Sequence, residues 1–163
     1  HAARLAHDKG STVVLNPAPA LELDDSLFQY VDYLTPNVTE AELLTGMQVM
    51  DEISAGIAAE LLHGRGLDHI LITRGSHGVY ASQRDTSGAI QGRSYPAFDV
   101  IAKDTTAAGD VFNGCLAVGL AEGKSLADAV IFAQAGAAIS VQTLGAQVSA
   151  PSLADIHSLI ANH

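Results

Sequence analysis

Short apolar segments alternate with helix-forming segments along the first half of the chain. Three of the apolar segments, at 12–16, 33–35 and 69–73, are short and are followed by turn-forming residues, which is typical of buried strands. The sequence between them predicts helices, so each strand must be joined to the next by a crossover connection. This order favours an α/β fold whose central sheet is mostly parallel and flanked by helices.

The other elements follow from helical spacing and from the glycine and proline residues that end each run. The sequence predicts helices at 25–31, 40–44, 51–64, 108–121, 125–141 and 152–161, and antiparallel strands at 79–81 and 90–95. No repeat and no low-complexity linker interrupts this series. A single compact unit is therefore expected, and 163 residues are enough to bury a sizeable core.

Two local features of these helices can be predicted in more detail. The helix at 40–44 is expected to begin with a capping box formed by Thr39 and Glu42, which are three residues apart. The predicted buried face of the helix at 51–64 consists of Ile53, Ile57, Ala58 and Leu61.

Composition and charge exclude several classes of protein. Hydrophobic residues make up 48% and charged residues 16% of the chain, which excludes intrinsic disorder. The net charge of −10 argues against nucleic acid or an anionic membrane as the main partner, because both need basic patches. No apolar run is long enough to span a bilayer. The single cysteine excludes a disulfide framework and favours a reducing compartment, so we expect a cytoplasmic protein.

The histidines and the cysteine offer no metal site. The seven histidines lack the spacing of metal ligands and are expected to be surface or loop residues. Cys115 lies on the apolar face of a predicted helix, where a small core residue is a better interpretation than a nucleophile.

The segment richest in chemistry is 104–114, which reads Asp-Thr-Thr-Ala-Ala-Gly-Asp-Val-Phe-Asn-Gly. It joins an extended segment at 97–102 to the helix at 108–121, and its small residues allow a ligand to approach the backbone closely. The free N–H groups and the dipole of a helix N-terminus suit a phosphate. Asp110 in the first turn is either a base that accepts a proton from an attacking hydroxyl or a residue that only caps the helix.

This segment closely resembles a signature of the ribokinase-like carbohydrate kinases, D-T-x-A-A-G-D-x-F-N-G. Further matches occur in the order in which the family has them, at Asn16–Ala20, Thr35–Glu42, Leu71–Gly78 and Gly145–Ser149. The resemblance covers essentially the whole chain and is stronger to the ribokinase branch than to the adenosine or fructose kinase branches. It implies a ribokinase-like fold.

The resemblance implies an ATP-dependent phosphorylation of a sugar, most specifically of D-ribose to D-ribose 5-phosphate. Asp110 would be the catalytic base and would contact the sugar's primary hydroxyl. The backbone amides of Ala107, Ala108, Gly109 and Asp110, here called the anion hole, would hold the transferred phosphoryl group.

The resemblance also implies sites for the nucleotide and for magnesium. Asn37 and Glu40 match the family motif N-x-x-E, in which Glu40 would bind Mg²⁺ through water. A solvated acid in the first turn of a helix is the alternative for Glu40, as an ordinary turn is for Gly78. Asn16 matches an asparagine near the nucleotide. The residues expected to bind the nucleotide are Asn37, Thr73, Gly75, Gly78, Gly109 and Gln134.

Members of the resembled family are activated by a monovalent cation, usually K⁺. The positions that would supply oxygen ligands to it are Asp104, Thr106, Ser140, Thr143, Gly145 and Ser149. Asp104 is alternatively a simple turn residue.

The resemblance is confined to the C-terminal half of the family's domain. The chain begins at His1 in what reads as the tail of a helix, so we expect that a longer protein carries an N-terminal half with sugar contacts and a lid. The full-length protein is expected to be a homodimer, and the chain alone is expected to be inactive. A kinase for another sugar or nucleoside and a non-catalytic nucleotide-binding fragment remain alternatives. A dinucleotide-binding oxidoreductase is excluded because no G-x-G-x-x-G follows the first strand.

Overall fold

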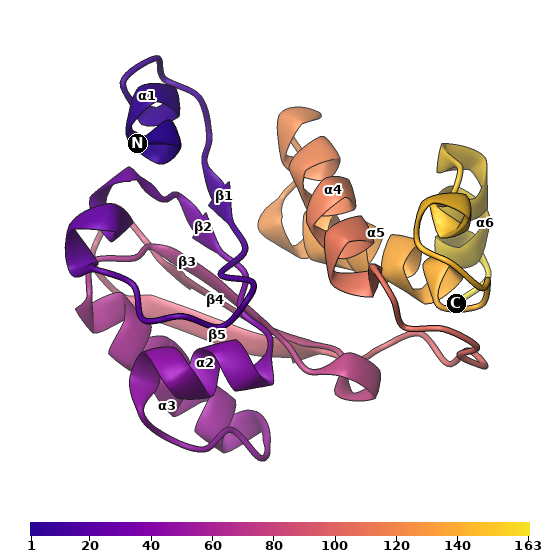
Figure 1. The fold of residues 1–163 in the computed structure, drawn as a ribbon, viewed down its shortest axis with the longest axis horizontal. Coiled ribbons are helices and arrows are strands. Elements are labelled where there is room, and N and C mark those ends of the chain that lie inside the picture. The colour runs from indigo at the N-terminus through magenta and orange to yellow at the C-terminus, as the bar shows by residue number, and fades with distance from the viewer. The chain divides into compact units, whose positions relative to one another are not determined.

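A computed structural model describes all residues, 1–163, and divides the chain into two compact units (Figure 1). Unit 1 contains residues 1–74 and 80–94, and unit 2 contains residues 75–79 and 95–163. The sequence predicted one compact unit. The sequence does not indicate this division, because the boundaries between the units lie at the ends of strands and no flexible linker is present there.

The sheet has five strands in the order β1-β2-β3-β4-β5. The strands are β1 (Val14–Leu15), β2 (Tyr33–Leu34), β3 (His69–Thr73), β4 (Val79–Arg84) and β5 (Ile90–Tyr95). The first three pair in parallel, with Leu15 opposite Leu34 and Leu34 opposite Ile70. The short connections after β3 and β4 cannot hold a crossover, so those strands run antiparallel. The predicted α/β class is confirmed.

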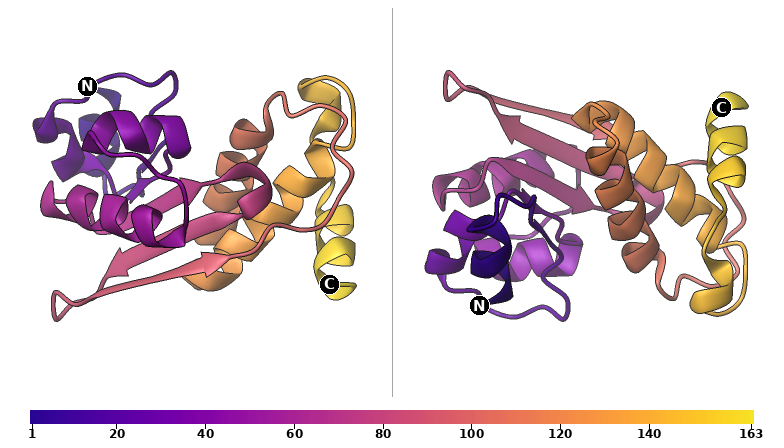
Figure 2. Two further views of the ribbon diagram at one scale, coloured as in Figure 1. Left: turned by 90° about the horizontal axis from the view of Figure 1, so that it is seen from below. Right: turned by 90° about the horizontal axis from the view of Figure 1, so that it is seen from above.

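Unit 1 surrounds its part of the sheet with helical elements. These are α1 (Ala2–His7), the 3₁₀-helix η1 (Asp25–Tyr30), α2 (Val38–Thr45) and α3 (Glu52–Gly64). Helices α2 and α3 cover one face of the sheet (Figure 2). The core between them includes Leu34, Ala41, Leu62 and Ile70, all of which are fully buried.

The predicted buried face of α3 is wrong in three of its four residues. Ile53 is 74% exposed, and Ile57 and Leu61 are both exposed as well. The face toward the core is made instead of alanines, together with Leu62 and His63, and the alanines are Ala55, Ala58 and Ala59. Small side chains let the helix pack closely on the sheet, so size of side chain overrode hydrophobicity in choosing the buried face.

The predicted capping box at Thr39 and Glu42 is also wrong. The N-cap of α2 is Asn37, whose side chain accepts a hydrogen bond from the Glu40 amide at 2.9 Å, while Glu40 accepts one from the Asn37 amide at 2.8 Å. Pro36 favours extended geometry before it, and the helix can begin as soon as that constraint ends. Glu42 instead accepts a hydrogen bond from the Val49 amide at 2.9 Å.

His63 is a correction to the prediction that the histidines lie at the surface or in loops. It is 1% exposed, and its two ring nitrogens lie 2.7 Å from the Leu67 carbonyl and 2.8 Å from the Ser82 hydroxyl. Burial is the main cause that lowers the pKa of His63 below its ordinary value. His63 is therefore a core residue of unit 1 whose polar atoms are satisfied.

Unit 2 is mainly helical. Its elements are the 3₁₀-helix η2 (Gly75–His77), α4 (Ala108–Ala121), α5 (Leu126–Ser140), the 3₁₀-helix η3 (Gln147–Ser149) and α6 (Leu153–Ala161). Helix α4 packs closely on α5 because Gly119 faces Ala129 and Gly136 faces Cys115. The predicted extended segment at 97–102 forms no strand. The longest helix, α5, has 15 residues, and none of the helices could span a lipid bilayer.

Cys115 lies beside a core cluster of Phe98, Phe132 and Ile156 in unit 2. Burial raises the pKa of the Cys115 thiol, which keeps it protonated and weakly reactive. This agrees with the prediction of a small core residue.

Candidate active site

Helix α4 begins without a side-chain cap, unlike α2, α3, α5 and α6, each of which has one. Its N-cap is Ala107, which has φ 61° and ψ 9° and is the only residue besides glycine with a positive φ. This left-handed conformation costs a non-glycine residue about 1–2 kcal/mol. A helix start that is both strained and uncapped leaves its amides available to a ligand.

Three of the four amides assigned to the anion hole have no acceptor within the protein. The amides of Ala107, Gly109 and Asp110 donate to no protein group, while that of Ala108 donates to the Thr105 carbonyl at 3.2 Å. The first helical hydrogen bond runs from the Val111 amide to the Ala107 carbonyl at 2.9 Å. Free N–H groups and the positive end of the helix dipole together favour an anion at this point.

The carboxylate of Asp110 is exposed and makes no hydrogen bond or ion pair with the protein. Ala107 is the N-cap, and the Asp110 side chain accepts no hydrogen bond from a backbone amide. The geometry therefore does not support the alternative that Asp110 caps the helix. Asn113, which the sequence argument did not single out, donates to the Gly109 carbonyl at 2.8 Å and braces the first turn. Asn113 and Gly109 are four residues apart in a predicted helix, and this spacing could have indicated that the two residues are in contact.

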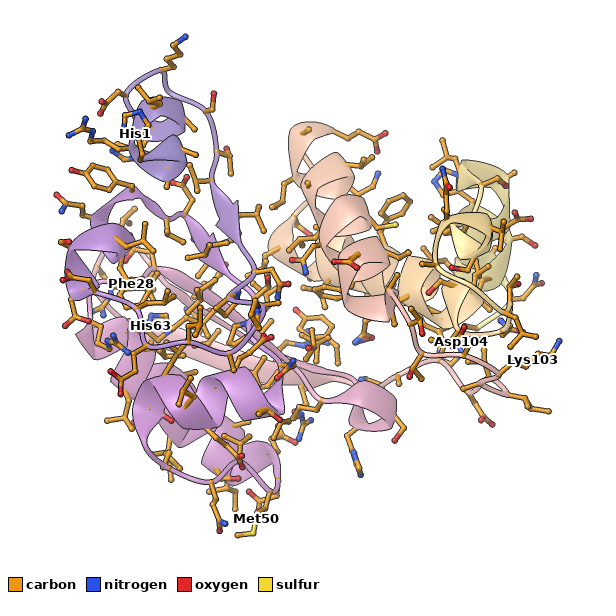
Figure 3. The ribbon with its side chains drawn as sticks, viewed as in Figure 1. His1, Phe28, Met50, His63, Lys103 and Asp104 are labelled. Atoms are coloured by element: carbon orange, nitrogen blue, oxygen red, sulfur yellow. The ribbon has the colours of Figure 1, made fainter.

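Asp104 joins the loop before α4 to the loop after α5 (Figure 3). One carboxylate oxygen accepts a hydrogen bond from the Thr106 amide at 2.9 Å, and the other accepts one from the Gly145 amide at 2.8 Å. The hydrogen bonds from Thr106 and Gly145 lower the pKa of Asp104 to about 2. Asp104 is thus more than a local turn residue, because its second bond spans 41 positions of the chain.

The other positions assigned to a monovalent cation lie in the same two loops or beside them. The Ser140 carbonyl accepts a hydrogen bond from the Thr143 amide at 3.2 Å, and the buried Ser149 hydroxyl donates to the Ala146 carbonyl at 2.7 Å. Their oxygen atoms fit a hard cation in chemical type. The structure contains no group of three or more histidine, cysteine, aspartate or glutamate side chains that could hold a metal ion.

In unit 1, the ends of β1, β2 and β3 bring together several residues assigned to the nucleotide. The Asn16 side chain donates to the Thr35 carbonyl at 2.9 Å, and Asn37 forms a parallel bridge with Thr73. Because parallel strands present their carboxyl ends at one edge, this edge is the usual place for a ligand in an α/β sheet. Glu40, which is 4% exposed, follows Asn37 within the same turn of α2.

Two further predicted nucleotide residues of unit 2 have structural contacts. A side chain on Gly78, whose φ is 81°, would collide with the Tyr95 carbonyl and approach the Ala97 nitrogen to 2.8 Å. Gln134 is buried and donates to the Tyr95 carbonyl at 3.1 Å. Packing therefore already explains both residues. Gly75 has a φ of 56° and no such crowding.

Comparison with known proteins identifies the family. A family model described as pfkB family carbohydrate kinase matches residues 1–153. The chain belongs to the pfkB family of carbohydrate kinases. Ribokinase of Haemophilus influenzae is 50% identical to this pfkB family chain over 151 residues, which are 93% of the chain and 48% of the relative. Deoxyribokinase of Salmonella typhi is 40% identical, covering 99% of the chain and 51% of the relative.

A solved structure gives the same result for the fold. Ribokinase of Arabidopsis thaliana, complexed with ribose and ATP, superposes with a TM-score of 0.84 at 31% identity, covering 97% of this chain and 50% of that one. The predicted ribokinase-like fold is confirmed. This member of the pfkB family spans about half the length of the curated relatives it matches.

Proposed function

We propose that the protein carrying this chain transfers the γ-phosphoryl group of ATP to the primary hydroxyl of a sugar, converting D-ribose to D-ribose 5-phosphate. The family and the ribokinase relatives support this reaction class. The observation that carries the proposal is the start of α4, where unpaired amides lie in the same turn as an unpaired carboxylate. Such a pairing suits a reaction in which a phosphoryl group is held while an alcohol loses its proton.

In this reaction, the sugar oxygen bonds to the γ-phosphorus as the bond from that phosphorus to the bridging oxygen of ADP breaks. Asp110 accepts the proton of the attacking hydroxyl, and ADP leaves with the bridging oxygen. The amides of Ala107, Gly109 and Asp110 stabilise the negative charge on the transferred group. The Ala108 amide contributes when its hydrogen bond to the Thr105 carbonyl breaks.

Asn37 and Glu40 of unit 1 supply nucleotide and magnesium contacts in this proposal. One carboxylate oxygen of Glu40 accepts a hydrogen bond from the Asn37 amide, and the other accepts none from the protein. The second oxygen is therefore available for a water-mediated contact with Mg²⁺. The Asn37 side-chain nitrogen likewise has no protein acceptor and is available to a phosphate. Bound Mg²⁺ would neutralise charge on the phosphates. Thr73 and Gly75 contact the nucleotide, whereas Gly78 and Gln134 shape its site through Tyr95.

A monovalent cation such as K⁺ would be held by oxygen atoms of Asp104, Thr106, Ser140, Thr143, Gly145 and Ser149. It would add positive charge near the anion hole. The sugar contacts, a lid and a homodimer interface belong to the part of the domain that lies outside this chain. One unpaired cysteine and the acidic charge fit a protein of a reducing compartment such as the cytoplasm, without nucleic acid or membrane as a partner.

The substitution Asp110→Asn tests the base. In the full-length protein it should lower kcat by at least about a thousandfold, because the side chain keeps its size but no longer accepts a proton. ATP should bind with unchanged affinity in a titration. Asp99→Asn is the matched control, since Asp99 is an exposed carboxylate that makes no hydrogen bond or ion pair with the protein. Turnover that survives Asp110→Asn would rule out the assigned base.

A second candidate substrate is 2-deoxyribose, because a deoxyribokinase shares 40% identity over 99% of the chain. The two sugars differ by one hydroxyl, so the ratio of their kcat/KM values measures the choice directly. We expect ribose to be preferred. A ratio in favour of deoxyribose would replace the substrate while leaving the phosphotransfer chemistry unchanged.

A further inference from the structure

The peptide unit that joins Gly109 to Asp110 lies at the proposed anion hole, and little packing surrounds it. A side chain placed on Gly109 would meet no atom within 4 Å. Both residues are exposed, and neither amide donates to a protein group. Glycine also has the widest choice of backbone angles. The direction of the Asp110 N–H must therefore be fixed by something other than packing.

Asn113 restrains this peptide unit from its carbonyl end. The side-chain nitrogen of Asn113 donates a hydrogen bond to the Gly109 carbonyl at 2.8 Å, across one helical turn. The Gly109 carbonyl and the Asp110 N–H belong to one planar peptide unit and point in opposite directions. A donor that fixes the direction of the carbonyl consequently fixes the direction of the N–H as well.

The sense of this hydrogen bond distinguishes the start of α4 from that of the other capped helices. In α2, α3, α5 and α6, the side chain of the N-cap residue accepts a hydrogen bond from a first-turn amide and so occupies that amide. Asn113 instead donates to a carbonyl, so it restrains the first turn of α4 and leaves the amides available. A hydrogen bond to a carbonyl also polarises the peptide unit and strengthens its N–H as a donor.

We propose that Asn113 is a positioning residue for phosphoryl transfer, whose side-chain amide orients the Asp110 N–H toward the transferred phosphoryl group through the Gly109 carbonyl. This inference rests on the proposed function, because the direction of that N–H affects turnover only if a phosphoryl group binds there. The role requires no contact between Asn113 and the nucleotide or the sugar.

Steady-state kinetics of the full-length protein tests the role. Asn113→Ala should lower kcat about tenfold, with the KM values for ATP and ribose changed less than about threefold, because a misdirected donor acts mainly on the transition state. Asn113→Ser should recover kcat to within about threefold of the unmodified protein, because a serine hydroxyl in a helix can donate to the carbonyl four residues before it. An unchanged kcat in Asn113→Ala, or a loss that serine does not recover, would overturn the proposal.

Asn162→Ala is the matched control. The Asn162 side chain makes a hydrogen bond of the same kind, because it donates to the Ser158 carbonyl at 2.7 Å, four residues before it at the end of α6. This variant should leave kcat unchanged, and urea denaturation should show similar small changes in stability for the two alanine variants. If Asn113→Ala lowers kcat only in proportion to a loss of folded protein, its role is structural and the proposal is wrong.

Binding of a transition-state mimic separates an effect on the anion hole from a general effect on the site. Aluminium fluoride bound with ADP, Mg²⁺ and ribose imitates the phosphoryl group during transfer, whereas ADP alone lacks that group. In calorimetric titrations, Asn113→Ala should weaken the aluminium fluoride complex about tenfold and leave the affinity for ADP unchanged. Equal weakening of both complexes would contradict a role in orienting the anion hole.

The outcomes separate this inference from the proposed function. If Asp110→Asn abolishes turnover and Asn113→Ala leaves kcat unchanged, the function stands and the positioning role is wrong. If the full-length protein transfers no phosphoryl group at all, the function fails and with it the catalytic role of Asn113. The nitrogen chemical shift of the Asp110 amide still measures whether Asn113→Ala alters this peptide unit and whether Asn113→Ser restores it.

Discussion

At the scale of single residues, backbone strain and buried polar atoms occur where the sequence gives little warning of either. Ala107 is the only non-glycine residue with a positive φ, and it directly precedes α4. Proteins retain strain of this kind where a function or the surrounding packing requires it. His63 is the second case, because it lies in an ordinary helical pattern yet has both ring nitrogens bound inside the core.

His63 should make the stability of the protein depend on pH. Burial lowers its pKa in the folded state below the value of about 6.5 expected in the unfolded chain. As the pH falls below about 6.5, the unfolded chain therefore takes up a proton that the folded protein resists. The stabilising contribution of His63 is complete above that pH and is lost as the pH falls through the lowered pKa.

The measurement is the free energy of unfolding in urea between pH 8 and pH 5. We expect a smaller decrease for His63→Gln than for the unmodified protein, although the variant is less stable at every pH because it loses a buried hydrogen bond, at about 1–3 kcal/mol. His1→Gln, at an exposed position, serves as the control. Identical pH dependence in His63→Gln and the unmodified protein would contradict the prediction.

At the scale of elements, close contact between α4 and α5 depends on glycines. A side chain at Gly136 would collide with the Cys115 sulfur, and one at Gly119 would lie 3.3 Å from the Ala129 side chain. Glycine within a helix costs roughly 1 kcal/mol relative to alanine. These glycines are therefore retained for packing, and they bring the helix that carries Asp110 against its neighbour.

Gly136→Ala should destabilise the protein by about 1–2 kcal/mol, because overpacking costs more than the gain in helix propensity. Adding Cys115→Ala removes the sulfur and should restore most of the loss. Gly114→Ala is the control, since nothing lies within 4 Å of a side chain placed there, and it should stabilise α4 by roughly 0.5–1 kcal/mol. Urea denaturation measures all four proteins, and a stabilised Gly136→Ala would refute the packing argument.

At the scale of the whole molecule, the limits of several helices and strands were predicted well, whereas long-range contacts were not. The predicted limits of α4 and β3 agree with the structure, because helical spacing and terminal glycines are local signals. Strands β1 and β2 are shorter than predicted, since only two residues of each pair with a neighbour. The division into two units escaped prediction because its boundary lies at strand ends.

The candidate site shows the same contrast. The motif around Asp110 predicted a helix start suited to an anion, and the structure places unpaired amides there. The bond between Asp104 and Gly145 joins residues 41 positions apart, and no spacing within the sequence could have predicted it. Gln134 was assigned to the nucleotide, but its bond to Tyr95 depends on tertiary packing of the same long-range kind.

The chain alone should show no ribose-dependent release of ADP, whereas a full-length protein should show it. The expectation follows from the length of the relatives, of which this chain covers about half. A coupled assay measures ADP, and circular dichroism of the same sample establishes that the chain is folded. Release of ADP at comparable rates by the 163 residues would contradict the prediction.

The two sides of α3 differ in how freely they can vary during evolution. Ala55, Ala58 and Ala59 are buried in the core, whereas the bulky aliphatic residues at 53, 57 and 61 are exposed. Natural variants and saturation mutagenesis should therefore accept lysine or glutamate at these outer positions and reject even valine at the alanines. Along this helix, we expect stricter selection at the small buried alanines than at the larger exposed aliphatic residues.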